Sequence, residues 1–318
     1  MKPEIIGLMI TCNEEWIIKQ SITILLKYVD AVFVLDASTD MTREILEEMD
    51  QVIVFYQENY SELTNYGEYR QFLLDAGRTL GYEYFVCIDA DETFPKSLTP
   101  SSFDVMIGKL PVGWAYQFDV WNFYGDLYTY TDKGRIGNKF IDVIFHDDGK
   151  MKYENRMVVH EKRTPATDYI KWKWNPLYHY GCLDSRKMDA RRMYYMLLEA
   201  SNDIRSIASI NFDYYVNSCF SRYYKGGSLK SIYDNAPYDI HDEMFNVAEP
   251  DCGEHFLLKC CEIYGSDFDK YVKLNLSGTM SPIRIFYDRI VELVKTKDLR
   301  VMFKSVKDYI ILDILKKW

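Results

Sequence analysis

Glycine and proline are scarce in this 318-residue chain, at 16 and 9 residues. That scarcity excludes collagen-like and low-complexity sequences. Positive charge is also in short supply, because 38 basic residues stand against 48 acidic ones and leave a formal net charge of −10. A general nucleic-acid-binding protein needs a basic surface, so we expect no nucleic-acid partner. The seven cysteines form no Cys-x-x-Cys pair, which argues against a structural zinc site.

Long hydrophobic runs are missing too. No stretch reaches the roughly 18 apolar residues of a membrane-spanning helix, and the apolar run at residues 5–10 is too short for the core of a signal peptide. Together with cysteines that lie inside apolar runs, these absences predict a cytoplasmic protein. Residues 284–318 hold nine basic and five acidic residues. Two interpretations stay open for this segment: a peripheral contact with the cytosolic face of a membrane, or a packed helix pair with a solvated basic face, which is the commoner case.

The composition that is present, with 48% apolar and 27% charged residues, is that of a globular protein. Over the first ninety residues, short apolar runs alternate with segments of helical periodicity. Strands are expected at residues 5–10, 31–35, 51–56 and 84–88, and helices at 14–28, 38–49 and 66–80. This alternation predicts parallel βαβ units with right-handed crossovers.

Polar residues follow three of the predicted strands, at 11–14, 36–40 and 89–92. The carboxyl ends of parallel strands share one edge of a sheet, and ligands bind beyond that edge. We therefore expect the three polar clusters to meet there and to form the binding site.

The character of the sequence changes after residue 113. The aromatic runs at 114–123 and 140–145 indicate antiparallel or mixed strands, and a helical pattern covers 183–200. After the glycine pair at 226 and 227 the pattern is mostly helical. We place a boundary near residue 225, with an α/β domain at 1–225 and a helical region at 226–318.

The sharpest chemical signal is the pair Asp89 and Asp91, which directly follows a predicted buried strand. Residues two apart at a strand end point the same way, so their carboxylates repel unless a proton or a cation relieves them. Mg²⁺ and Mn²⁺ are hard cations that bind one or two carboxylates together with substrate phosphates. The pair therefore favours a divalent metal site, although the same tripeptide also occurs in solvated loops.

Further segments occur in a specific order along the chain. They are Asn13-Glu14-Glu15 after the first strand, Asp36-Ala37-Ser38-Thr39-Asp40-Met41-Thr42 after the second, Tyr69-Arg70-Gln71, Asp89-Ala90-Asp91-Glu92, Val159-His160-Glu161 and Tyr178-His179-Tyr180-Gly181. In this order and spacing they resemble the family 2 glycosyltransferases, in the branch that includes lipooligosaccharide glucosyltransferases. The usual Asn is replaced by Gln71 after Arg70.

The resemblance implies a GT-A fold, which is a Rossmann-like α/β fold with a mostly parallel sheet flanked by helices, and here a mainly helical C-terminal region. It implies a metal-dependent enzyme with Mn²⁺ or Mg²⁺ that moves a sugar, with inversion, from a UDP- or GDP-sugar to an acceptor hydroxyl. The acceptor is a glycan, a lipid-linked molecule or a protein, and the sequence does not choose among them.

The resemblance also assigns the donor-binding residues. Thr11 and Asp36 would hold the nucleotide base, Asp36 by accepting a hydrogen bond from a base N–H. Asn13 and Glu14 lie in the same donor-binding segment, and Arg70 would reach the base or the phosphates.

The resemblance assigns the metal ligands and the catalytic base to the later motifs. Asp89 would contact ribose or metal, Asp91 would bind metal, and His179 would complete the metal site, a role that His160 could exchange with it. Glu161 stands where a catalytic base is expected. Its alternative is a surface ion pair, and the alternative for His179 is a hydrogen-bonded core histidine.

Two other functions compete. A nucleotidyltransferase would need a glycine-rich, basic phosphate loop after the first strand, where this chain has Thr-Cys-Asn-Glu-Glu. A non-catalytic nucleotide-sugar or glycan-binding module would keep the fold without turnover, since a fold alone does not establish activity.

Overall fold

The computed structural model describes residues 4–57, 66–131, 140–154, 162–203, 205–215, 230–231 and 240–248, with single positions at 258, 260, 261, 288 and 292. The chain divides into two compact units. The first comprises Met1–Tyr130, Lys139–Leu183 and Lys230–Pro250, and the second comprises Thr131–Asn138, Asp184–Leu229 and Asp251–Trp318. The predicted boundary near residue 225 lies outside the described residues, as does nearly all of the predicted helical region at 226–318, so both stay predictions.

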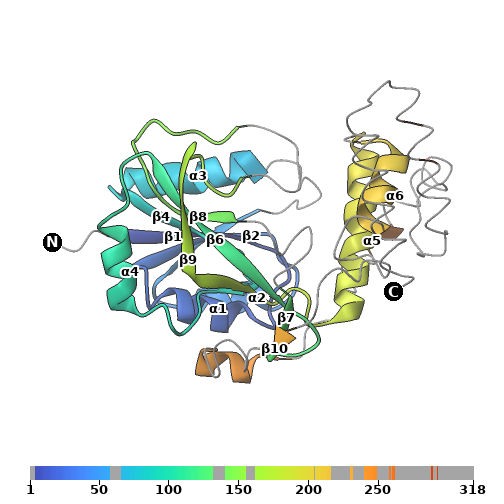
Figure 1. Ribbon diagram of the computed structural model, residues 1–318, viewed down its shortest axis with the longest axis horizontal. Coiled ribbons are helices and arrows are strands. Elements are labelled where there is room, and N and C mark those ends of the chain that lie inside the picture. Colours follow the sequence, from blue (N-terminus) through green and yellow to red (C-terminus); the bar gives the residue numbers. More distant parts are fainter. Residues whose placement is uncertain are drawn as a thin grey trace. The chain divides into compact units, whose positions relative to one another are not determined.

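The first unit alternates strands and helices and then continues mainly in strands (Figure 1). Its elements are β1 (Ile5–Thr11), α1 (Ile18–Leu25), β2 (Ala31–Asp36), α2 (Thr42–Glu47), β3 (Val52–Tyr56), α3 (Tyr66–Thr79), β4 (Tyr84–Cys87), β5 (Glu92–Thr93), α4 (Pro100–Ile107), β6 (Trp114–Phe123), β7 (Thr129–Thr131), β8 (Ile141–His146), β9 (Asp168–His179), β10 (Lys230–Ser231) and the 3₁₀-helix η2 (Asp242–Asn246). The second unit contains α5 (Ser185–Ser201) and α6 (Ile207–Tyr215).

The sheet has the strand order β10-β7-β6-β8-β4-β1-β2-β3. Strands β4, β1, β2 and β3 run parallel to one another, whereas β8 is antiparallel to both β4 and β6. The predicted α/β, GT-A-like arrangement is therefore confirmed, including the mixed strands that the aromatic runs indicated. None of the described helices is long and apolar enough to cross a membrane.

The two faces of β1 bury different sets of side chains. Ile5 and Met9 belong to the apolar cluster that contains the buried face of α1, whereas Ile6 and Leu8 belong to the cluster that contains Leu73 of α3. Figure 1 shows α3 on one side of the sheet and α1 on the other. Because alternate residues of a strand point to opposite faces, a continuous apolar run is what a strand covered on both sides requires.

Strand β9 is irregular where it runs beside β6. It pairs in parallel with β6, with Phe118 opposite Trp172 before an irregularity and Val120 opposite Leu177 after it. Between these two pairs the chain advances by five residues in β9 but by only two in β6. Trp174, within the extra length, is 82% exposed. Beyond the irregularity, β9 also pairs with β5.

Gly77 allows α3 to pack closely on β4. A Cβ atom added at Gly77 would lie 2.6 Å from Cε1 of Phe85, a fully buried ring. We expect Gly77→Ala to lower the free energy of unfolding by about 1–3 kcal/mol, because overpacking strain outweighs the gain in helix propensity. Chemical denaturation measures the change.

Gly108→Ala is the matched control, because its added Cβ would meet only backbone oxygens at 3.5 Å and beyond. An unchanged stability for both variants would contradict this account of the contact between α3 and β4.

His241 is a buried histidine that joins η2 to α1. Its ring nitrogens lie 3.3 Å from Lys27 Nζ and 3.4 Å from the Tyr28 hydroxyl. Burial and the charge of Lys27 lower the pKa of His241 to about 4. Between pH 6.5 and 4 the unfolded chain therefore binds a proton that the folded chain excludes. As the pH is lowered through this range, the free energy of unfolding decreases by up to about 1.4 kcal/mol per pH unit.

We expect His241→Gln to remove this part of the pH dependence. Urea unfolding of the wild type and the variant at pH 7, 6 and 5 measures it, and equal slopes in the two proteins would contradict the assignment.

Candidate functional site

The loops after β1 and β2 are tied together by Asn13. Thr11 and Asp36 are paired at the ends of the two strands. Asn13 has φ 56°, a left-handed conformation that asparagine tolerates well. Its N–H donates to Ser38 Oγ at 2.8 Å, and its Oδ1 accepts from the Thr39 N–H at 2.7 Å. The side chain of this predicted donor-binding residue thus fixes the shape of the loop.

Glu14 connects the same loops to the start of α1. Its N–H donates to Thr42 Oγ1 at 2.9 Å, and its carboxylate accepts from Trp16 Nε1 at 2.5 Å. Its carbonyl accepts from the N–H groups of Ile17 and Ile18. These contacts position the loop, and the predicted role of Glu14 in donor binding stays a prediction.

Asp36 is fully buried and contacts Arg43, a residue that the sequence analysis did not single out. Its Oδ1 accepts from the Ser38 N–H at 3.1 Å, and its Oδ2 lies 3.5 Å from Arg43 Nε. The Arg43 guanidinium lies 4.2 Å from the centre of the Tyr56 ring. Among the described residues, the buried Thr11 Oγ1 has no hydrogen-bond partner. The carboxylate of Asp36 and the Thr11 hydroxyl, which can still form hydrogen bonds, therefore lie at adjacent strand ends.

The loop that carries Asp89 and Asp91 is held from several sides. The Ser21 hydroxyl of α1 donates to the Ala90 carbonyl, and the Tyr180 N–H donates to the Asp91 carbonyl at 2.8 Å. The β4 end also joins β1, since the Ile88 N–H donates to the Leu8 carbonyl. The third predicted polar cluster is thus at the same sheet edge as the other two.

Arg163 forms ion pairs with two carboxylates of this region, and sequence reasoning missed it. Its Nη2 lies 2.6 Å from Asp89 Oδ2 and 2.8 Å from Glu92 Oε1, while its Nη1 pairs with Glu92 Oε2. Burial disfavours the charged guanidinium, but the charges of Asp89 and Glu92 outweigh it and raise the Arg163 pKa. Burial raises the pKa of Glu92, and Arg163 counteracts that effect.

The structure brings Asp91 and His179 together, as the resemblance implied. His179 Nε2 lies 3.3 Å from Asp91 Oδ2, and His179 Nδ1 lies 2.6 Å from Asn122 Oδ1 of β6. Strand pairing fixes this geometry, because His179 is opposite Glu92 of β5 on one side and opposite Asn122 on the other. Asn122 is a partner that the sequence analysis did not identify.

The Asp91–His179 pair fits two adjacent ligands of one divalent cation. Ligands about 2.1 Å from an ion and at roughly right angles to each other lie about 3 Å apart. A histidine ligand typically has its other ring nitrogen hydrogen-bonded, as Asn122 does here. Within the described residues, no group of three His, Cys, Asp or Glu side chains forms a complete metal cage, so two protein ligands would have to be supplemented by substrate oxygens.

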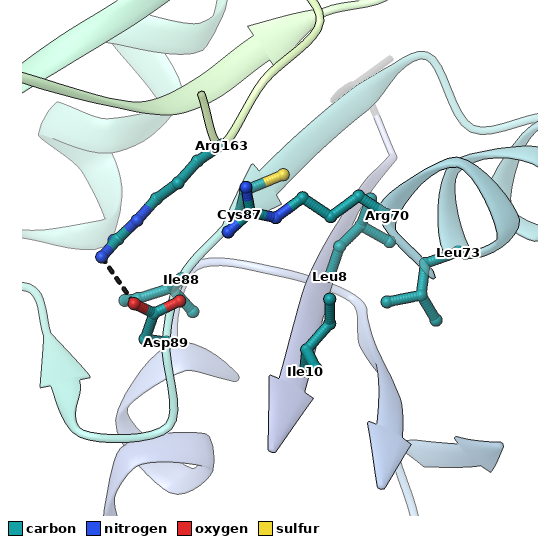
Figure 2. A pocket seen from close by; sticks show the side chains of 8 residues that line it. All are labelled: Leu8, Ile10, Arg70, Leu73, Cys87, Ile88, Asp89 and Arg163. Carbon is teal, nitrogen blue, oxygen red and sulfur yellow. Dashed lines mark hydrogen bonds and ion pairs between the residues drawn. The ribbon is translucent and has the colours of Figure 1, made fainter. Parts of the chain in front are cut away.

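A small pocket, partly open to solvent, lies beside this loop. Arg70, Asp89 and Arg163 provide its polar lining, and the apolar part comes from Leu8, Ile10, Leu73, Cys87 and Ile88. Figure 2 shows Arg70 reaching in from α3 and Arg163 from the segment before β9. Two guanidinium groups and one carboxylate thus face a single space.

The neighbours of Arg70 and Arg163 hold both arginines in place. Arg70 Nη1 donates to the Lys162 carbonyl at 2.8 Å, and the Tyr153 hydroxyl donates to the Arg163 carbonyl at 2.8 Å. Gln71 Oε1 accepts from the Tyr153 N–H at 2.9 Å. The residue that departs from the family pattern therefore positions the segment that faces the pocket.

Two predicted residues, Glu161 and His160, lie outside the described residues. The predicted catalytic role of Glu161 and the exchange of roles between His160 and His179 therefore stay predictions.

The fold and the site together define an α/β protein with its polar groups at the carboxyl ends of parallel strands, where such proteins bind ligands. The family model described as Glycosyl transferase family 2 matches residues 8–142. The matched stretch runs from β1 into β8 and covers less than half of the chain, so this part of the chain is similar to family 2 glycosyltransferases.

Solved structures with a similar chain path include TarS of S. aureus. The TarS structure has 16% identity and a TM-score of 0.37, and the match covers 84% of this chain and 54% of that one, so the chain spans about half of its length. The structure of TarS 1–349 in complex with UDP-GlcNAc has 13% identity, a TM-score of 0.41 and coverage of 96% and 91%. The search of curated protein sequences gives no match.

Proposed function

We propose that this protein transfers a sugar from a nucleotide-diphosphate sugar to an acceptor hydroxyl. The observation that carries the proposal is the contact of His179 with Asp91 at the carboxyl end of β4, beside Asp89 and a pocket lined by two arginines. Asp89 and Asp91 lie within the residues that the family 2 model matches. This arrangement offers separate places for a cation and for a diphosphate, which are the two components that leave together in such a reaction.

Formal charges at the site support a divalent cation. Asp89, Asp91 and Glu92 carry three negative charges, and Arg70 and Arg163 carry two positive ones, which leaves a net charge of −1. A diphosphate brings further negative charge into this partly buried space. Its binding therefore requires added positive charge, because unpaired buried charges are costly.

Asp91 and His179 are the residues that would hold Mn²⁺ or Mg²⁺, with Asp89 nearby to contact the metal or the ribose. When bound, the cation would neutralise the charge that develops on the leaving diphosphate. Asn122 would orient His179 through its bond to Nδ1. Arg70, which lines the pocket, would contact the base or the phosphates.

The strand ends of β1 and β2 suit the base of the donor. Asp36 supplies an acceptor for a base N–H, and the Thr11 hydroxyl has hydrogen-bonding capacity left over among the described residues. Uracil and guanine both carry a ring N–H, whereas cytosine lacks one. We therefore propose a UDP- or GDP-sugar as donor, with Asn13 and Glu14 shaping the binding loop.

Glu161 is the proposed general base, which removes the proton of the acceptor hydroxyl as that oxygen attacks the anomeric carbon from the face opposite the diphosphate. This single displacement inverts the anomeric centre. The assignment rests on the resemblance of His160-Glu161 to the family motif. The acceptor would be a glycan, a lipid-linked molecule or a protein. The basic segment 284–318 keeps both of its interpretations, a peripheral contact of a cytoplasmic enzyme with a membrane or a packed helix pair with a solvated basic face.

Removal of the metal should abolish turnover. We expect EDTA to stop release of nucleoside diphosphate from UDP- or GDP-sugars and Mn²⁺ to restore it. Asp91→Asn should lower turnover by about 10²-fold or more, because it weakens a charged ligand of the cation, while its thermal unfolding stays near that of the wild type.

Asp50→Asn, at an exposed aspartate in the turn before β3, is the control and should retain full turnover. Full activity of the Asp91 variant would move the metal elsewhere. Binding of nucleotide sugars without any consumption would instead identify a binding module.

Loss of the general base should affect chemistry more than binding. We expect Glu161→Gln to lower kcat by roughly 10²-fold or more with KM for the donor near normal. Steady-state kinetics beside Glu48→Gln, an exposed glutamate at the end of α2, measures the effect. Unchanged kcat would exclude Glu161 as the base.

A further inference from the structure

Arg163 has two carboxylate partners that differ in burial. Glu92 is 1% exposed and takes both terminal nitrogens of the guanidinium, whereas Asp89 is 45% exposed and takes Nη2 alone. Breaking the pair with Glu92 would strand a buried charge, which is expensive. Breaking the contact with Asp89 would return a half-exposed carboxylate to water. Glu92 is therefore the fixed anchor of Arg163, and Asp89 is its exchangeable partner.

The exchangeable contact faces the pocket. Arg163 and Asp89 both line it, and Arg70 enters from the other side (Figure 2). An arginine anchored by a buried carboxylate is preorganised, so little side-chain entropy is lost when it binds an anion. Its planar donor geometry suits phosphate oxygens as well as carboxylates.

We propose that Arg163 is a diphosphate-binding residue, anchored by Glu92, that rests on Asp89 until an anion displaces this contact. The inference deepens the proposed function and rests on it for the identity of the substrate. When a diphosphate enters with a divalent cation, a phosphate oxygen replaces Asp89 at Nη2, and the released Asp89 carboxylate turns to the cation or the ribose. Every charge then faces an opposite one, and no bond to Glu92 is lost.

The proposal predicts opposite effects on the two ligands when Arg163 is removed. We expect Arg163→Gln to weaken binding of Mg²⁺-pyrophosphate by about tenfold or more, since a hydrogen bond to a charged group is lost. The same substitution should tighten binding of Mn²⁺ alone several-fold, because Asp89 no longer has a competing cation. Isothermal titration with pyrophosphate and electron paramagnetic resonance of free Mn²⁺ measure the two constants.

Arg78→Gln is the matched control. Arg78 also forms a paired contact, with the buried Asp147 at 2.7 Å for both bonds, but it does not line the pocket. It should leave both dissociation constants unchanged. If Arg163→Gln does not fold because Glu92 is left unpaired, the double variant Arg163→Gln/Glu92→Gln removes both charges together and should show the same opposite shifts.

Three results would overturn the proposal: unchanged constants in a folded variant, weaker Mn²⁺ binding in that variant, or no binding of pyrophosphate by the wild type. The outcome is separable from that of the proposed function. Opposite shifts in a protein that consumes no nucleotide sugar would refute the transferase activity alone, whereas unchanged constants in an active transferase would refute only the role of Arg163.

Discussion

The candidate site is organised by the need to pair the negative charge of one buried carboxylate, Glu92, with a positive charge. Glu92 is almost completely enclosed at the start of β5, and a charge in that position is tolerated only with a partner in place. Arg163 is that partner, and it comes from the segment that leads into β9. The ion pair therefore joins the Asp89–Glu92 loop to a segment more than seventy residues later, and β9 then places His179 beside Asp91. A single electrostatic requirement thus links both halves of the site.

Most of the N-terminal half could be predicted from the sequence because its signals are local. Apolar runs of five or six residues, three of them followed by polar clusters, predicted β1 to β4, and Gly81, which has φ 87°, lies just beyond the end of α3. The order of parallel strands also predicted that residues after β1, β2 and β4 would meet at one edge. The juxtaposition of Asp91 and His179 came from the resemblance alone, since nothing local joins positions so far apart.

The missed residues share a physical reason. Arg163 occurs in a run of charged residues, which in a sequence looks like a solvated surface, and only its long-range contact with Glu92 makes it buried. Arg43 lies on a short helix, and Asn122 lies inside an aromatic strand where an amide looks incidental. Their roles depend on pairing between distant segments, which one sequence does not display. The contacts of Asn13 and Glu14 show how they shape the loop, whereas their roles in donor binding remain predictions.

The extra length in β9 has a consequence for chemistry at its far end. In an uninterrupted ladder, Asn122 would face position 176 instead of His179, since Phe118 faces Trp172. Three additional residues correspond to about 10 Å of strand. An odd offset also reverses which side of the sheet a side chain occupies. Straightening this short excursion would move the imidazole away from the aspartate, so the irregularity around the exposed Trp174 sets the pairing register that brings His179 to Asp91.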